Sequence, residues 1–163
     1  MSHQVARTLT RRALFALCAA GLFVGAAALA APPVNTLTPG SSGRHGDAAI
    51  AGYDTVAYFT AGKPTMGEDR FVHTWMGAKW KFASRDHLEL FEGNPEKYAP
   101  QYGGYCAYGV AQDNLVSIEP DKFKILDGKL YLNYSAQVQS LWLKDPAAYV
   151  KQADAKFEAL LKQ

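Results

Sequence analysis

Three side chains have the chemistry to hold a soft or borderline metal ion: the imidazoles of His73 and His87 and the thiol of Cys106. Two imidazoles and one thiolate suit copper or zinc. The three residues are far apart along the chain, so only folding can bring them together. The sequence therefore defines a candidate metal site at Cys106, His73 and His87, with one copper or zinc ion as its cofactor.

Each of these residues also has a structural interpretation. His73 alternates with aromatic residues and fits a core histidine that makes one hydrogen bond. His87 fits the exposed flank of a helix. Cys106 follows Gly103-Gly104 at the start of a predicted helix, Cys106 to Gln112, whose positive end would favour a thiolate. A lone cysteine is also commonly buried and inert, so both interpretations of Cys106 stay open.

A second hypothesis needs no metal. Tyrosines gather near the paired glycines, where they could line a site for a small ligand or for a partner protein of the cell envelope. The candidate ligand-binding residues are Tyr102, Gly103, Gly104, Tyr105 and Tyr108. Packing of aromatic residues in a small core is the alternative explanation.

The sequence favours a binding role over an enzymatic one. It has no glycine-rich phosphate loop, no His-Glu-x-x-His helix and no Cys-x-x-Cys pair. Asp54 and Asp113 are isolated carboxylates of the kind that cap helices or turns. We therefore expect no catalytic residues.

The first 30 residues are typical of a signal peptide. Arg7, Arg11 and Arg12 precede an uncharged apolar run, and residues 28–30 read Ala-Leu-Ala, a cleavage pattern that puts Ala31 first in the mature chain. The adjacent arginines are similar to a twin-arginine export signal, although general secretion stays open. We expect a periplasmic protein with no membrane span after the signal is removed.

Removing residues 1–30 also changes the charge and the cysteine count. The remaining chain has 14 basic and 15 acidic residues, a net charge of −1, and no basic cluster that would indicate binding to nucleic acid. Cys18 leaves with the signal, so Cys106 is the one cysteine of the mature chain.

The mature chain divides into a flexible leader over residues 31–47, rich in Pro, Gly, Ser and Thr, and one domain over residues 48–163 without an internal repeat. Two hairpins are predicted in the domain. The first turns at Gly77-Ala78, which pairs Trp75 with Trp80 and His73 with Phe82 and places His73 on the apolar face. The second turns at Asp127-Gly128, which pairs Ile125 with Leu130 and Phe123 with Leu132.

Three further helices are predicted from capping residues and apolar spacing. Ser84 caps a short helix that buries Leu88 and Phe91, Ser135 caps a second that carries Trp142, and Asp145-Pro146 opens a third. Hairpins and helices together predict the α+β class, with a small single domain of two β-hairpins packed with about three helices.

The chain resembles the YHS domain family. The resemblance rests on residues 73–84 (HTWMGAKWKFAS), on 102–107 (YGGYCA) and on 127–134 (DGKLYLNY), and it extends from about Gly52 to Ala155. The last two stretches are similar to the exported single-domain branch of the family. Members associated with heavy-metal transport have a Cys-Ser and a second Cys where this chain has Ala83 and His87, so their thiolate pair is missing here.

Overall fold

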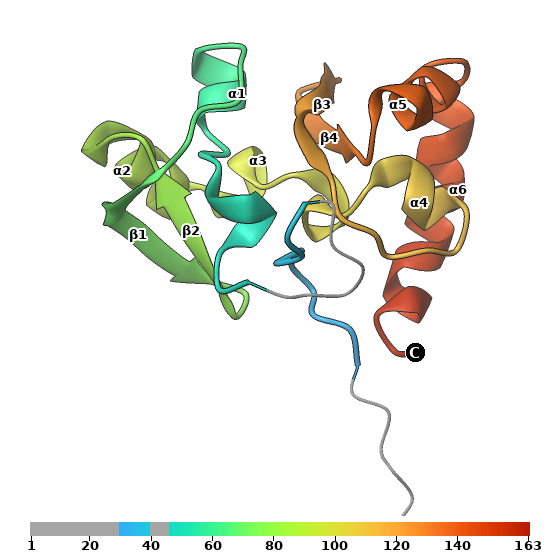
Figure 1. The fold of residues 1–163 in the computed structure, drawn as a ribbon, viewed down its shortest axis with the longest axis horizontal. Helices are drawn as coiled ribbons and strands as arrows, with labels where there is room; N and C mark the ends of the chain where they lie inside the picture. The colour runs from blue at the N-terminus through green and yellow to red at the C-terminus, as the bar shows by residue number, and fades with distance from the viewer. Residues whose placement is uncertain (1–29, 40–45) are drawn as a thin grey trace, which may run out of the picture.

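The computed structural model describes residues 30–39 and 46–163, which form an α+β structure with two antiparallel hairpins (Figure 1). The predicted α+β class is therefore confirmed. Nearly all of the predicted signal peptide lies outside the described residues. His45, a histidine of the predicted leader, lies outside them as well.

The described residues contain the same succession of elements twice. The first half consists of η1 (Ala49–Gly52), α1 (Ala57–Thr60), β1 (Glu68–Trp75), β2 (Ala78–Phe82), α2 (Arg85–Gly93) and α3 (Pro95–Tyr98). The second half consists of η2 (Gln101–Gly104), α4 (Ala107–Ala111), β3 (Glu119–Leu126), β4 (Lys129–Asn133), α5 (Ala136–Trp142) and α6 (Pro146–Leu160). Figure 1 shows the two hairpins, each with its own helices, on opposite sides of the molecule.

The prediction that the domain has no internal repeat was wrong. Both strands of the second hairpin begin and end 51 positions after those of the first. The ladders share one irregularity, because pairing shifts between Glu68 and Val72 in β1 and between Glu119 and Phe123 in β3. Few residues are identical between the halves, so the similarity lies in caps, turns and burial rather than in repeated letters.

Turn chemistry explains both hairpins. The second turns at Asp127-Gly128, with φ of 51° and 74°, and its predicted pairs are confirmed. The first turns at Met76-Gly77, with φ of 49° and 78°, one position earlier than predicted. A turn with positive φ at both central residues matches strand twist and commonly has glycine second, whereas the prediction had placed Gly77 first.

The corrected turn changes partners but not faces. His73 pairs with Trp80 rather than with Phe82, and Trp75 pairs with Ala78. Because the register moves by two positions in total, His73 stays on the face that carries Trp75 and Trp80.

Side-chain caps start the main helices as predicted. Ser84 accepts from His87 N and begins α2, and Ser135 accepts from Val138 N and begins α5. Asp145 accepts from Ala148 N in front of Pro146 and begins α6. The sequence analysis missed α3, which Asn94 caps in the same way in front of Pro95.

The buried apolar side chains of the described residues form three clusters. One lies in the first half around Trp80, Phe82 and Phe91, and a second lies under α6 around Tyr131 and Trp142. The third is shared between the halves and contains Ile50, Tyr58, Cys106, Ile118, Leu130 and Leu132. Tyr58 also donates to the Pro120 carbonyl, so each half completes the burial of the other.

The predicted flexible leader is, over residues 31–39, an ordered part of the structure. Val34 and Asn35 are almost fully buried. Asn35 donates from its backbone N to the Gly103 carbonyl and from Nδ2 to the Gly104 carbonyl. These bonds satisfy buried polar groups that water cannot reach, and Figure 1 shows the segment, in blue, running between the halves.

Candidate functional site

Asp54 and Cys106 occupy equivalent places in the two halves. Each follows a short left-handed turn, with φ of 42°, 58° and 81° at residues 50–52 and of 56°, 58° and 86° at 102–104. At the start of a short helix, Asp54 then accepts from Val56 N and Ala57 N, and Cys106 accepts from Gly109 N. The same turn therefore presents a carboxylate in one half and a thiol in the other.

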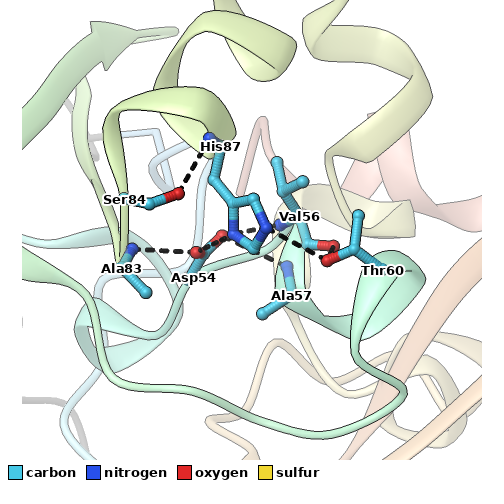
Figure 2. A network of polar contacts seen from close by, with 7 residues as sticks. All are labelled: Asp54, Val56, Ala57, Thr60, Ala83, Ser84 and His87. Carbon is cyan, nitrogen blue, oxygen red and sulfur yellow. Dashed lines mark hydrogen bonds and ion pairs between the residues drawn. The ribbon is translucent and has the colours of Figure 1, made fainter.

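The Asp54 carboxylate is wholly buried and anchors a polar network (Figure 2). Oδ1 accepts from Val56 N at 2.9 Å and from Ala57 N at 3.2 Å. Oδ2 accepts from Ala83 N at 2.8 Å and lies 2.6 Å from His87 Nδ1. One carboxylate thus joins the start of α1, the end of β2 and the α2 helix.

His87 continues the network to the surface. Its Nε2 lies 3.1 Å from Thr60 Oγ1, and that hydroxyl lies 3.2 Å from the Val56 carbonyl oxygen. When both ring nitrogens carry hydrogen, every group has a complementary partner, since Nδ1 donates to Asp54, Nε2 donates to Thr60 and Thr60 donates to Val56. The side chain of His87 is 21% exposed, so it is less exposed than the helix flank predicted for it, and its contact with Asp54 was not foreseen.

The Cys106 thiol lies at the position in the second half that corresponds to Asp54, and its surroundings are less polar. Its Sγ accepts from Gly109 N and from Tyr134 N, both at 3.3 Å, and lies 3.9 Å from Asn133 Oδ1. Burial raises the pKa of the thiol, and the N–H donors offset this only in part. Of the two interpretations that the sequence left open, this environment favours the buried, protonated thiol, because desolvation outweighs the donors.

A hollow of about 230 Å³ opens beside Cys106. Its lining consists of Cys106, Tyr108, Gly109, Gln112, Asn114, Val116, Tyr134 and Val138. Val138 is the counterpart of His87, as both stand three positions after the capping serine. At this place the first half has an imidazole bonded to a carboxylate, and the second half has a smaller apolar side chain beside an open hollow.

His73 belongs to a different environment. Its Nδ1 lies 3.1 Å from Glu92 Oε1, and its ring lies 6.1 Å from that of Phe91. The side chain is 30% exposed, so the aromatic face predicted for it is correct while full burial is not.

The structure separates the three proposed metal ligands into three settings: His73 with Glu92, His87 with Asp54, and Cys106 with backbone N–H groups. Within residues 30–39 and 46–163, no three His, Cys, Asp or Glu side chains are grouped so that they could hold a metal ion together.

The tyrosine-lined site predicted around Gly103-Gly104 is largely interior. Tyr102 and Tyr105 are buried, and their hydroxyls donate to Asp154 Oδ1 and to the Pro32 carbonyl. A side chain at Gly103 would collide with the Pro33 carbonyl, 1.9 Å from where its Cβ would lie. The N-terminal segment packs against this region. Of the predicted set, Gly103 lines a hollow of about 250 Å³ beside Pro33 and Leu161, and Tyr108 lines the Cys106 hollow.

Sequence reasoning missed Asp54, Thr60, Tyr134 and Val138 as members of the two equivalent sites. A signal for them exists, because a capping serine is followed after ten positions by Asn94-Pro95 in one half and by Asp145-Pro146 in the other. Aligning those two motifs places His87 opposite Val138. Extending the alignment toward the N-terminus pairs the left-handed turn at 50–52 with the one at 102–104.

Comparisons with known proteins leave the family open, since no family model matches the chain and neither the curated proteins nor the solved structures contain a significant match. In the part of the chain that the structure describes, no helix has the length and apolar character needed to span a membrane.

Proposed function

We propose that the chain is an exported YHS-type binding domain of the cell envelope, and that the hollow beside Cys106 receives one large apolar side chain of a partner protein. The motifs around residues 73–84, 102–107 and 127–134 support the family assignment, and the signal-like residues 1–30 support export to the periplasm.

The size of the hollow favours a side chain over a free small molecule. Pockets for drug-sized ligands usually measure about 300–1,000 Å³, whereas this hollow measures about 230 Å³. Its lining is mostly apolar, and a single leucine, phenylalanine or methionine would fill it.

The rim has the composition of an interaction site. Tyr134, just before the N-cap of α5, is 45% exposed at the edge of the hollow, and Leu141, on α5 itself, is 39% exposed. Val138 and Leu141 are three positions apart within α5 and therefore lie on one face of that helix. Tyrosine is enriched among the residues that dominate binding energy at interfaces.

The observation that carries the proposal is the difference between the halves. Asp54 has His87 as its side-chain partner, and the equivalent Cys106 has Val138 beside an open hollow. The two halves share a framework, but the second half has an open apolar space where the first has a polar network. This difference supports a binding role for the second half.

A photo-reactive phenylalanine derivative at position 134 tests the proposal in the envelope. Its crosslinked partner is identified by mass spectrometry and purified, and its affinity is measured for the unmodified protein. Tyr134→Ala should weaken binding at least tenfold, about 1.4 kcal/mol, and Val138→His, which fills the hollow, should do the same.

Leu90→Ala is the matched control, because Leu90 is the counterpart of Leu141 in the first half and is 43% exposed. It should leave the affinity unchanged. Equal losses for Leu90→Ala and Tyr134→Ala, or no partner at position 134, would refute the proposed site.

Copper or zinc binding at Cys106 is a second proposal. It is favoured by the two backbone N–H groups that point at Sγ and would stabilise a thiolate once a metal replaces its proton. Binding should weaken as the pH falls, since the thiol must lose its proton. Metal analysis of protein purified without chelators decides it: metal retained by the unmodified protein and lost in Cys106→Ser supports the proposal, and equal content in both refutes it.

A further inference from the structure

The nitrogen of Ala31 lies at the carboxyl end of the longest helix. Its backbone N donates to the Leu161 carbonyl at 3.0 Å, and Leu161 is the C-cap of the 15-residue α6. The last carbonyl groups of a helix lack partners within it and carry partial negative charge. This position therefore favours a positively charged donor.

The neighbouring residues fix Ala31 in that place. The Pro32 carbonyl accepts from the Tyr105 hydroxyl at 3.0 Å, and Asn35 N donates to the Gly103 carbonyl at 2.9 Å. Val34, between them, is almost fully buried. The segment thus leads to the end of α6 along a defined path.

We propose that the carboxyl end of α6 is the binding site for the mature N-terminus of this chain. The inference rests on the proposed removal of residues 1–30. Hydrolysis of the Ala30–Ala31 peptide bond consumes one water, leaves a carboxylate on Ala30 and leaves an ammonium group on Ala31. The Ala31 nitrogen that donates to the Leu161 carbonyl then carries a positive charge. Cleavage of the signal peptide therefore stabilises the folded mature protein.

Two charged side chains, Glu158 and Lys162, stand close to Leu161 in the sequence at this end of α6. Glu158 lines a hollow together with Pro33, Phe157 and Leu161, and its carboxylate adds to the attraction for an ammonium group. In the same turn, Gln163 N donates to the Leu160 carbonyl. Lys162 is the opposing charge in this turn.

The test compares the exported protein, whose terminus is first confirmed as Ala31 by intact mass, with the same protein after selective transamination of its α-amine to a neutral carbonyl. The modified protein should melt about 2 °C lower at pH 7. The difference should vanish as the pH rises well above about 8, where an α-amine loses its charge. A variant with Gly-Ser inserted after Ala30 moves the amine away from Leu161, and its melting temperature should not respond to transamination.

Equal melting temperatures before and after transamination of a protein that begins at Ala31 would overturn this inference and leave the proposed export intact. An exported protein that begins elsewhere would overturn both. The same response in the Gly-Ser variant would show that the charge acts without contact with α6, which also overturns the site.

Discussion

Ala83 N donates to Asp54 and Tyr134 N donates to Cys106, and these two bonds are the same contact in the two halves of the molecule. In each half the residue just after the second hairpin strand donates to the side chain that accepts from backbone N–H at the start of α1 or α4. The repeat thus preserves a backbone connection while exchanging a carboxylate for a thiol. The consequences for stability differ between the halves and can be measured.

Within the Asp54 network, the more buried side chains should contribute more to the free energy of unfolding. His87→Val introduces the residue found at position 138 and removes one bond to a buried carboxylate, so we expect a loss of about 1–3 kcal/mol. Thr60→Val removes only the exposed end of the network and should cost less than about 1 kcal/mol. Chemical denaturation measures both, and equal losses would show that His87 does not support Asp54.

The docked N-terminal segment should make Gly103 far less tolerant of substitution than Gly128. Both have positive φ, of 58° and 74°, but an added Cβ meets the Pro33 carbonyl at Gly103 and nothing within 4 Å at Gly128. Gly128→Ala should cost about 1 kcal/mol from backbone strain, and Gly103→Ala should cost at least about 2 kcal/mol more. Similar melting temperatures for the two variants would mean that residues 31–39 do not cover η2.

Position 73 should accept a cation. His73→Lys keeps a positive group near Glu92 at a half-exposed site, so we expect a loss below about 1 kcal/mol. Thr74→Lys, on the opposite face, serves as the comparison in thermal melts. A loss above about 2 kcal/mol for His73→Lys alone would indicate a buried position instead.

Stability should fall in alkali because several phenols are buried. Burial raises the pKa of Tyr105 to about 12, and it also raises the pKa of Tyr58 and of Tyr102. In the unfolded chain these phenols lose protons from about pH 10, while the folded protein retains them, so the free energy of unfolding falls above that pH.

The slope of that decline identifies the contribution of Tyr105. Between about pH 10 and 12, Tyr105→Phe should show a shallower decline of the free energy of unfolding than the unmodified protein. The variant also loses the hydrogen bond to the Pro32 carbonyl. This loss lowers its free energy of unfolding at every pH but does not change how steeply that free energy falls with pH. An unchanged slope would place Tyr105 in contact with water.

Local chemistry was sufficient to predict much of the fold. Ser84, Ser135 and Asp145-Pro146 specify helix starts because their side chains satisfy backbone N–H groups within three positions. Asp127-Gly128 specifies its turn because those residues tolerate positive φ. The turn at Met76-Gly77 was harder to predict, because no local preference explains a positive φ at a methionine. The pairing of β1 with β2 holds Met76 in that conformation.

Tertiary structure alone decided the sites. Asp54 meets His87, and Cys106 meets Tyr134, across 33 and 28 positions of chain, and no local preference determines which distant groups share a buried space. The composition of residues 31–39 indicated a flexible leader, yet Asn35 is buried because η2 offers carbonyl groups that need donors. The sequence by itself determined which segments become helices, strands and turns, since those follow from neighbouring residues. Only packing of the two halves decided that one turn presents a bonded carboxylate and the other a thiol beside an open hollow.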